Sequence, residues 1–264
     1  MVRTARSVAV LAVAAFALTA CGSEDAPAGS AALDPQVIKA GALTVCADMP
    51  YEPFESLKAG KPVGFDVDLV DEIAKRLKVK PVIQDTDFDA IQSGESLNSG
   101  DCDVAISAMT ITGERARVLD FSSPYFDASQ AMVVDKGESM TSLADAAGKK
   151  IGVQGGTTGE LYVTDNAPSD AEIVPLEDQS AMEAALKSGD VDAAVYDNTV
   201  VGDVISRNPS FEMVAEFDTG EQYGMAVRKN GSVDLLRTIN DVLADLKSDG
   251  GYDTIYTKWF GSTS

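Results

Sequence analysis

Short apolar runs alternate with helical patterns along much of the chain and predict an α/β fold. Residues 104–108 form a nearly unbroken apolar run, which is typical of a strand buried on both faces of a parallel sheet. Two further strands are predicted at residues 43–47 and 79–83. Between them, apolar residues at helical spacing predict a helix that Asp66 caps. The expected buried face of this helix consists of Leu69, Val70, Ile73 and Leu77.

Part of this pattern occurs twice. Residues 97–105 (LNSGDCDVA) resemble residues 186–194 (LKSGDVDAA), and each segment is typical of a helix end, a glycine cap and a buried strand. Residues 43–48 and 150–155 are also similar. Chance is the alternative, because this junction is common, but the two pairs together indicate two related α/β lobes whose strand ends face each other. Small-molecule sites tend to lie in clefts between lobes.

The chain is expected to cross between these lobes twice. Residues 132–135 are predicted to form the first strand of the second lobe, and residues 222–227 the strand that returns to the first. We therefore expect lobe 1 to comprise residues 37–127 and 221–264, and lobe 2 to comprise residues 128–220.

The N-terminus resembles a targeting segment. Arg3 and Arg6 precede an apolar stretch, residues 8–17, that is too short to span a bilayer as a permanent helix. Residues 18–21 (LTAC) resemble a bacterial lipobox, which implies cleavage before Cys21 and lipidation of its thiol. A plain secretory signal is the alternative.

A flexible tether is expected to follow the cleavage site. Residues 1–20 are predicted to be the removed lipoprotein signal peptide, and residues 21–36, mostly Gly, Ala, Ser and Pro without periodicity, the tether. The protein is thus expected to be extracytoplasmic and to be held at the cell membrane by its lipid anchor only.

Composition excludes several classes of function. The formal net charge is −21, which argues against nucleic acid, because Lys and Arg must neutralise phosphates in such complexes. The sequence contains no histidine, which excludes His-based catalytic triads, His general bases and His metal sites. We expect neither a metal nor another cofactor.

Two cysteines remain once Cys21 is assigned to lipidation. Cys46 and Cys102 lie in or at the start of strands that should be neighbours. An exported protein meets an oxidising environment, and an even number of cysteines favours pairing. A disulfide between them is the prediction, and two separate buried thiols are the alternative.

Polar residues follow the buried strand at residues 104–108. Ser107, Thr110 and Arg115 lie where ligands of open α/β sheets bind, outside the carboxyl ends of the strands. A guanidinium there can hold a carboxylate or phosphate through two parallel hydrogen bonds. The alternative is a surface arginine that opens a helix.

A second anion site is indicated by a glycine turn. Residues 151–158 (IGVQGGTT) are typical of a strand, a glycine turn and a helix start, whose free N–H groups can bind an anion. A plain strand–helix corner explains the same residues. Asp197 ends the strand of the repeated pattern and is either a ligand for a cation or a solvated aspartate.

The segment SAMTITGER at residues 107–115, followed by LDFS at 119–122 and PYF at 124–126, resembles the signature of the family 3 extracellular solute-binding proteins. These proteins are the polar amino-acid receptors of ABC importers. The similarity extends from about residue 43 to residue 260. It implies a type II periplasmic binding protein fold, in which two Rossmann-like lobes are joined by a two-strand hinge. It also implies a monomer that delivers an L-amino acid to an ABC transporter permease.

The resemblance also implies roles for individual residues. Arg115 is expected to bind the α-carboxylate of the ligand together with Thr158, and Asp197 its α-ammonium group. Tyr51 and Phe88 match aromatic positions that sandwich the ligand's side chain, although Phe88 is equally compatible with a place in the core. The full set of expected ligand-binding residues is Asp48, Tyr51, Phe88, Ser107, Ala108, Met109, Thr110, Arg115, Gln154, Thr158 and Asp197.

The identity of the amino acid depends on Asp48, which matches a family position that contacts the distal polar group. An acid there favours a donor, either the cation of Lys or Arg or the amide of Gln, and Gln154 could add a second contact. We rank basic amino acids slightly above glutamine. Glutamate would need another cation in the pocket.

Two other classes of function are compatible with the fold. Some relatives are dehydratases that act on ring acids, and an exported enzyme of that kind would need a general acid in the cleft. The pairing of Arg115 with Asp197, which suits a zwitterion, argues against this class, so we expect no enzyme activity. A ligand-sensing module is the other alternative, and it would have to signal through a separate membrane protein.

Overall fold

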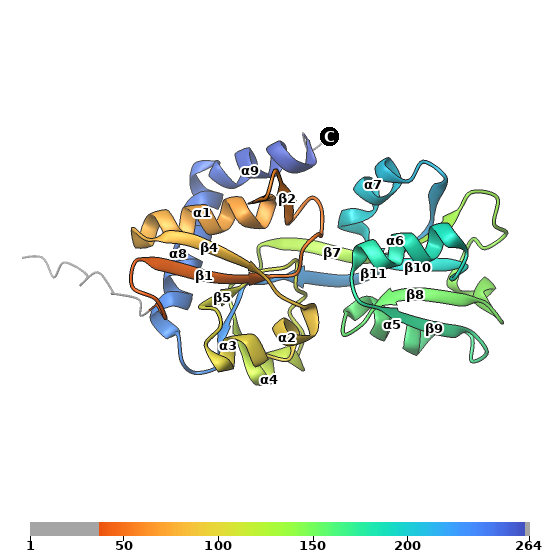
Figure 1. Ribbon diagram of the computed structural model, residues 1–264, viewed down its shortest axis with the longest axis horizontal. Coiled ribbons are helices and arrows are strands. Elements are labelled where there is room, and N and C mark those ends of the chain that lie inside the picture. Colours follow the sequence, from red (N-terminus) through yellow and green to blue (C-terminus); the bar gives the residue numbers. More distant parts are fainter. Residues whose placement is uncertain (1–36, 262–264) are drawn as a thin grey trace, which may run out of the picture. The chain divides into compact units, whose positions relative to one another are not determined.

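The computed structural model describes residues 37–261 and contains two mixed five-stranded sheets (Figure 1). The first sheet has the strand order β4-β1-β5-β12-β6. Its strands are β1 (Ala42–Ala47), β4 (Lys80–Asp85), β5 (Val104–Ala105), β6 (Leu119–Phe121) and β12 (Ala226–Arg228). β1 pairs in parallel with β4 and β5, whereas β12 is antiparallel to β5 and β6.

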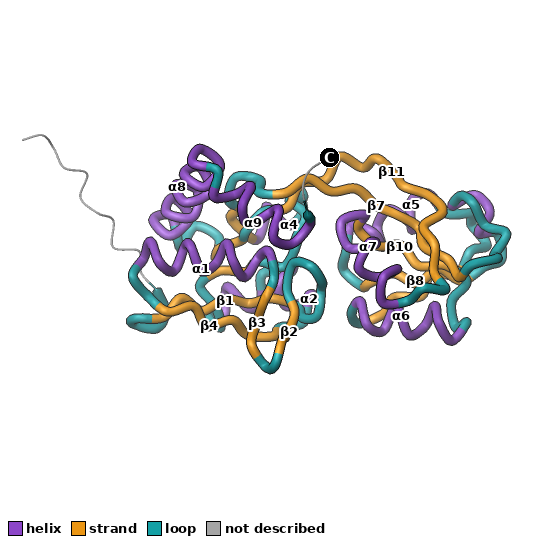
Figure 2. Tube along the Cα trace, turned by 90° about the horizontal axis from the view of Figure 1, so that it is seen from above, coloured by secondary structure: helices purple, strands orange, loops and turns teal. Residues whose placement is uncertain are grey.

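The second sheet has the order β11-β7-β10-β8-β9. Its strands are β7 (Phe126–Asp135), β8 (Lys150–Gln154), β9 (Glu172–Leu176), β10 (Ala193–Asp197) and β11 (Phe211–Tyr223). β8 pairs in parallel with β9 and β10, and β7 is antiparallel to both β10 and β11. Figure 2 shows β7 and β11 running side by side from one sheet to the other. The predicted α/β class with two connected sheets is therefore confirmed.

Helices flank both sheets, and a hairpin of β2 (Ser56–Lys58) and β3 (Lys61–Val63) precedes the first of them. The helices of the first part are α1 (Phe65–Leu77), α2 (Phe88–Gln92), α3 (Glu95–Ser99), α4 (Arg115–Val118), α8 (Val233–Asp249) and α9 (Gly251–Phe260). Those around the second sheet are the 3-10 helix η1 (Leu143–Ala146), α5 (Thr158–Asn166), α6 (Gln179–Ser188) and α7 (Asn198–Arg207). Within residues 37–261, no helix is both long enough and apolar enough to span a bilayer.

The repeated sequence pattern has a structural counterpart. α3 and α6 both end at a left-handed glycine, Gly100 and Gly189, and each leads into a strand of the sheet interior. The following aspartates, Asp103 and Asp192, each accept the backbone N–H of a residue in the neighbouring parallel strand at 2.8 Å. The same residues thus join helix, turn and sheet in the same way at both places.

Two details differ from the sequence prediction, at the start of α1 and between β11 and β12. The N-cap of α1 is Gly64, not Asp66, and a Cβ on Gly64 would lie only 1.8 Å from the carbonyl oxygen of Phe54. Asp66 is instead buried inside the first turn of α1. The strand predicted at residues 222–227 is interrupted at residues 224–225, because β11 ends at Tyr223 and β12 begins at Ala226. A Cβ on Gly224 would meet the side chain of Ile111 at 2.7 Å.

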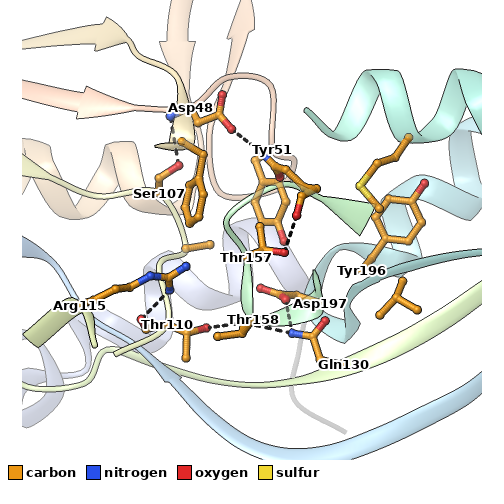
Figure 3. A pocket seen from close by; sticks show the side chains of 16 residues that line it. Asp48, Tyr51, Ser107, Thr110, Arg115, Gln130, Thr157, Thr158, Tyr196 and Asp197 are labelled. Atoms are coloured by element: carbon orange, nitrogen blue, oxygen red, sulfur yellow. Dashed lines mark hydrogen bonds between the residues drawn. The ribbon is translucent and has the colours of Figure 1, made fainter. Parts of the chain in front are cut away.

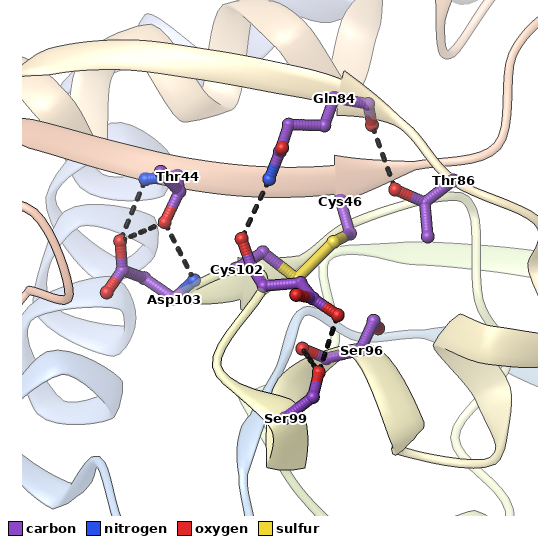
Figure 4. The surroundings of a disulfide bond; sticks show 9 residues. Thr44, Cys46, Gln84, Thr86, Ser96, Ser99, Cys102 and Asp103 are labelled. Atoms are coloured by element: carbon purple, nitrogen blue, oxygen red, sulfur yellow. Dashed lines mark hydrogen bonds between the residues drawn. A yellow bond between two sulfur atoms is a disulfide. The ribbon is translucent and has the colours of Figure 1, made fainter.

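Cys46 in β1 and Cys102 before β5 form a disulfide with a Cα–Cα distance of 5.8 Å (Figure 4). Both side chains are buried in a core cluster that also contains Phe88 and Leu97. Next to it, Asp103 accepts hydrogen bonds from the backbone N–H and the hydroxyl of Thr44. The disulfide therefore ties together two strands whose ends carry residues of the pocket described below.

We predict that the free energy of unfolding of the variant Cys46→Ala/Cys102→Ala is about 2–4 kcal/mol lower than that of the native protein. The disulfide closes a loop with a sequence separation of 56, and its loss restores conformational entropy to the unfolded chain. Denaturant titration with and without reductant measures the effect. The native protein should lose stability on reduction and the variant should not. Equal sensitivity of both proteins to reductant would contradict the prediction.

Candidate functional site

A pocket lies where the carboxyl ends of strands from both sheets approach each other (Figure 3). It contains about 490 Å³ of space free of protein atoms, including the part open to solvent. Its lining residues are Asp48, Tyr51, Phe88, Ser107, Ala108, Thr110, Arg115, Gln130, Gln154, Thr157, Thr158, Gly159, Met182, Val195, Tyr196 and Asp197.

The structure brings ten of the eleven residues expected from the sequence to this pocket. The remaining one, Met109, is fully buried in the core cluster around the disulfide, so its side chain packs and does not line the pocket. Cys21 lies outside the described residues.

Arg115 begins α4 and extends a buried guanidinium into the pocket. Nη1 donates to the carbonyl oxygen of Thr110 at 2.8 Å, and Nη2 donates to that of Gly156 at 3.0 Å. The guanidinium carbon is 5.1 Å from the centre of the Phe88 ring. Burial lowers the pKa of Arg115 to about 10, so the group stays cationic at neutral pH. Within residues 37–261, Arg115 forms no ion pair, and its charge is free to meet an anion.

Asp197 supplies a negative charge at the end of β10. One oxygen accepts a hydrogen bond from Gln130 Nε2 at 2.6 Å, and the other accepts one from the hydroxyl of Tyr223. Burial raises the pKa of Asp197 to about 6, and the nearby carboxylate of Glu221 adds to the rise. At neutral pH the pocket thus presents a cation and an anion on different walls (Figure 3).

Glu221 is a charged neighbour of the pocket that the sequence analysis did not select. Its carboxylate accepts hydrogen bonds from the hydroxyls of Thr110 and Thr158, at 2.7 and 2.6 Å, and from Gln130 at 3.0 Å. Burial alone would raise the pKa of Glu221, but these hydrogen bonds and one from Thr219 lower it below its usual value. Glu221 therefore remains negative and orients two hydroxyls of the pocket.

The far end of the pocket is acidic. Asp48 follows β1, and its Oδ2 accepts a hydrogen bond of 2.6 Å from Gln154 Nε2. Burial raises the pKa of Asp48 to about 7; the hydrogen bond from Gln154 opposes this rise, and the carboxylates of Asp178, Asp85 and Asp87 add to it. A cationic group placed here would favour the ionised form of Asp48 and bind to it.

Six lining residues were not expected: Gln130, Thr157, Gly159, Met182, Val195 and Tyr196. Thr157 and Gly159 flank the predicted Thr158 at the start of α5, so the helix start itself was a sufficient signal. Gln130 belongs to the largely apolar strand β7, and nothing in its sequence neighbourhood distinguishes it. Met182, Val195 and Tyr196 are ordinary core residue types, and only the tertiary arrangement places them at a cavity.

The arrangement suits a small zwitterion whose side chain carries a further donor. The lining contains one guanidinium and two carboxylates. The start of α5 adds backbone N–H groups beside Arg115, which favour an anion at that end. Among residues 37–261 there is no group of three or more Cys, Asp or Glu side chains placed to hold a metal ion.

Comparison with known proteins agrees with a site for a small zwitterion. The sequence profile described as "Bacterial extracellular solute-binding proteins, family 3" matches residues 43–262. A probable histidine-binding protein of Neisseria gonorrhoeae is 35% identical over 96% of this chain and 94% of its own length. ABC transporter arginine-binding protein 1 of Escherichia coli is 34% identical over 80% of this chain and 87% of its own length.

Solved structures agree with the fold. A structure described as an ancestral arginine-binding protein bound to arginine has a TM-score of 0.79 and 46% identity, and covers 84% of this chain and 99% of its own. A second, described as an ancestral arginine-binding protein bound to glutamine, has a TM-score of 0.79, 45% identity and the same coverage of both chains.

We predict that Asp48→Asn becomes more stable relative to the native protein as the pH rises. The pKa of Asp48 is about 7 in the folded protein against a usual value of 3.8. The stability that protonated Asp48 contributes is therefore fully present below pH 3.8 and is lost as the pH rises through 7. The asparagine lacks this titration. Denaturant titrations at about pH 5 and pH 8 should show a relative gain of up to about 3 kcal/mol. A stability difference that is the same at both pH values would contradict the prediction.

Proposed function

The chain belongs to the bacterial extracellular solute-binding proteins, family 3, and on this premise we propose that it is the substrate-binding component of an ABC importer for a polar L-amino acid. The observation that carries the proposal is the pair Arg115 and Asp197 in one pocket. Only a ligand with both an anionic and a cationic group satisfies both walls at once. A free amino acid has these two groups on one carbon atom.

The proposed pose follows from the charges. The α-carboxylate binds Arg115 and the N–H groups at the start of α5, and the α-ammonium group binds Asp197. The side chain extends between Tyr51 and Phe88 toward Asp48. Glu221 adds to the negative potential on the ammonium side.

We further propose that the preferred ligand is basic, with glutamine as the second choice. The support is the acidic end of the pocket, where Asp48 faces Gln154. The single cation among the lining residues named above, Arg115, is assigned to the ligand's carboxylate. The relatives named above bind histidine or arginine by their names, and one of the ancestral structures contains glutamine. An acid at this position accepts hydrogen bonds from either kind of side chain, and the cation adds a charge interaction.

Contacts across the pocket support a mechanism in which two lobes close on the ligand. We propose the lobe boundaries given above, with residues 37–127 and 221–264 in lobe 1 and residues 128–220 in lobe 2. Arg115 then contacts Gly156 of the opposite lobe, and Asp48 contacts Gln154. A ligand that adds contacts only when the lobes are closed shifts the equilibrium toward the closed form.

The membrane anchor and the partner are also part of the proposal. Lipidation of Cys21 after removal of residues 1–20 would hold the receptor at the extracytoplasmic face, with residues 21–36 as its tether. The receptor would act as a monomer that passes its ligand to an ABC transporter permease. The relatives found are described as binding proteins, and no observation favours the dehydratase alternative.

A thermal-shift screen against the twenty amino acids tests the function and the ligand class together. We predict that L-arginine or L-lysine raises the unfolding midpoint most, followed by L-glutamine. At a concentration about 1,000 times Kd, a ligand adds roughly 4 kcal/mol of stability.

In Asp48→Asn the shift caused by the basic ligand should fall below the shift caused by glutamine, because the charge interaction is lost. The proposal fails if no amino acid shifts the native protein, and the ligand ranking fails if Asp48→Asn keeps the native order.

We predict that Arg115→Ala weakens amino-acid binding by roughly 3–5 kcal/mol, because it leaves the ligand's carboxylate buried and unpaired. Isothermal titration calorimetry with the ligand found in the screen measures this loss. The matched control is Arg117→Ala in the same helix. The side chain of Arg117 is 72% exposed and, within residues 37–261, pairs only with Glu114, so its removal should change binding by less than about 0.5 kcal/mol. Near-native affinity of Arg115→Ala would overturn the assignment.

A further inference from the structure

Two buried carboxyl groups lie directly behind the pocket and have no counterion. Glu55 is fully buried and Asp66 is 1% exposed. Neither forms an ion pair within residues 37–261, and the titratable groups that interact with them are Asp48, Tyr51, Tyr125, Tyr252 and each other. Two ionised carboxylates at this depth would repel each other with little solvent screening.

Each carboxyl group holds a residue of the pocket with one of its oxygens. Asp66 Oδ2 accepts hydrogen bonds from the backbone N–H of Ala108 at 3.0 Å and from the hydroxyl of Tyr125 at 2.9 Å. Glu55 Oε1 accepts one from the hydroxyl of Ser107 at 2.5 Å. The hydroxyl of Ser107 in turn accepts the backbone N–H of Asp48 at 3.1 Å.

The other two oxygens have no partner: Glu55 Oε2 and Asp66 Oδ1 are both buried and without a hydrogen bond. The two carboxyl groups bind the consecutive residues Ser107 and Ala108, and in addition to burial the charge of Asp66 raises the pKa of Glu55, so the two groups are neighbours. A single proton between these two oxygens would satisfy both and would leave one negative charge on the pair. Burial raises the pKa of both groups, and the pKa of Glu55 lies well above its usual value.

The surroundings indicate where the proton resides. Asp66 has two donors on one oxygen and lies in the first turn of α1, where the helix dipole favours a negative charge. Glu55 has a single donor, from Ser107. These surroundings favour Glu55 as the neutral acid and Asp66 as the carboxylate.

We propose that Glu55 and Asp66 share one proton as a hydrogen-bonded acid pair that positions residues 107–110 for ligand binding. Ala108, which lines the pocket, has a φ of 43°, a left-handed conformation that residues other than glycine rarely adopt. Its N–H is held by Asp66, and the preceding Ser107 is held by Glu55. The pair touches no ligand and acts through these two residues. The positioning role rests on the function proposed above, whereas the shared proton does not.

The first experiment tests the proton without any ligand. Infrared spectra in deuterium oxide at about pH 8.5, above the pKa of about 7 of Asp48, should contain the C=O band of a neutral carboxylic acid. Glu55→Gln should abolish this band, because the amide can still donate to Asp66 but has no carboxylic acid C=O group. Glu72→Gln, which removes a partly exposed carboxyl of α1 paired with Lys75, is the matched control and should keep the band. Absence of the band from the native protein, or its persistence in Glu55→Gln, would overturn the shared proton.

The second experiment tests positioning by calorimetry with L-arginine and by hydrogen exchange of the Ala108 amide. Glu55→Gln should bind within about threefold of the native protein, because it reproduces the protonated pair. Asp66→Ala should bind at least about tenfold more weakly and should exchange the Ala108 amide faster, because that N–H loses its acceptor. Asp66→Asn should recover most of the affinity, since its amide oxygen can accept from Ala108.

If Asp66→Ala does not fold, it is replaced by the variant Asp66→Ala/Tyr125→Phe. This variant also removes the hydroxyl of Tyr125, the second donor that Asp66→Ala leaves without an acceptor. Native affinity and native Ala108 exchange in the folded variant would overturn the positioning role. If the native protein does not bind L-arginine, the proposed basic ligand fails. The infrared band and the exchange of the Ala108 amide then still decide the inference about the acid pair.

Discussion

The organisation of the pocket depends on a buried guanidinium that has no carboxylate partner in the part of the chain that the structure describes. Arg115 is 4% exposed and is held by two backbone carbonyl oxygens, which fix its orientation but leave its charge uncompensated. An isolated buried charge is unfavourable unless an anion completes it. The carboxylates of Asp197 and Glu221 lie close enough to influence it but form no ion pair with it. This separation of charge lets the pocket select a ligand that carries its own carboxylate and its own cation.

Strand topology brings these charges together. In each sheet a helix ends at a left-handed glycine and leads into an interior strand, and the residues that follow the strand face the pocket. Asp197 is the last residue of the interior strand β10, whereas Arg115 begins α4 after the loop that follows β5. The long strands β7 and β11 connect the two sheets, and their polar residues Gln130 and Glu221 link the two halves of the site through hydrogen bonds.

Acidic groups surround the site in layers with different roles. Asp48 and Asp197 face the pocket and have raised pKa values, so a cationic ligand favours their ionised forms. Glu221 remains charged because hydroxyl and amide groups donate to it. Glu55 and Asp66 lie deeper, where only a proton is available to reduce their repulsion. Acidic groups are therefore also present in the interior of this strongly negative chain, where hydrogen bonds and protonation stabilise them. Within residues 37–261, none of these carboxyl groups forms an ion pair with a lysine or arginine.

The sequence by itself determined the α/β class, the two-sheet arrangement, and most residues of the pocket, because these depend on local apolar periodicity, glycine caps and motifs at strand ends. Only the tertiary structure decided the rest. Asp66, in a position typical of a helix cap, is drawn inward to the N–H of Ala108, because the close approach of Gly64 to Phe54 buries the start of the helix. Gln130 and Glu221 lie at the site because the two long strands β7 and β11 pair. Met109, which was expected at the site, packs in the core around the disulfide instead. Such placements depend on which distant segments meet, and a local pattern carries no information about that.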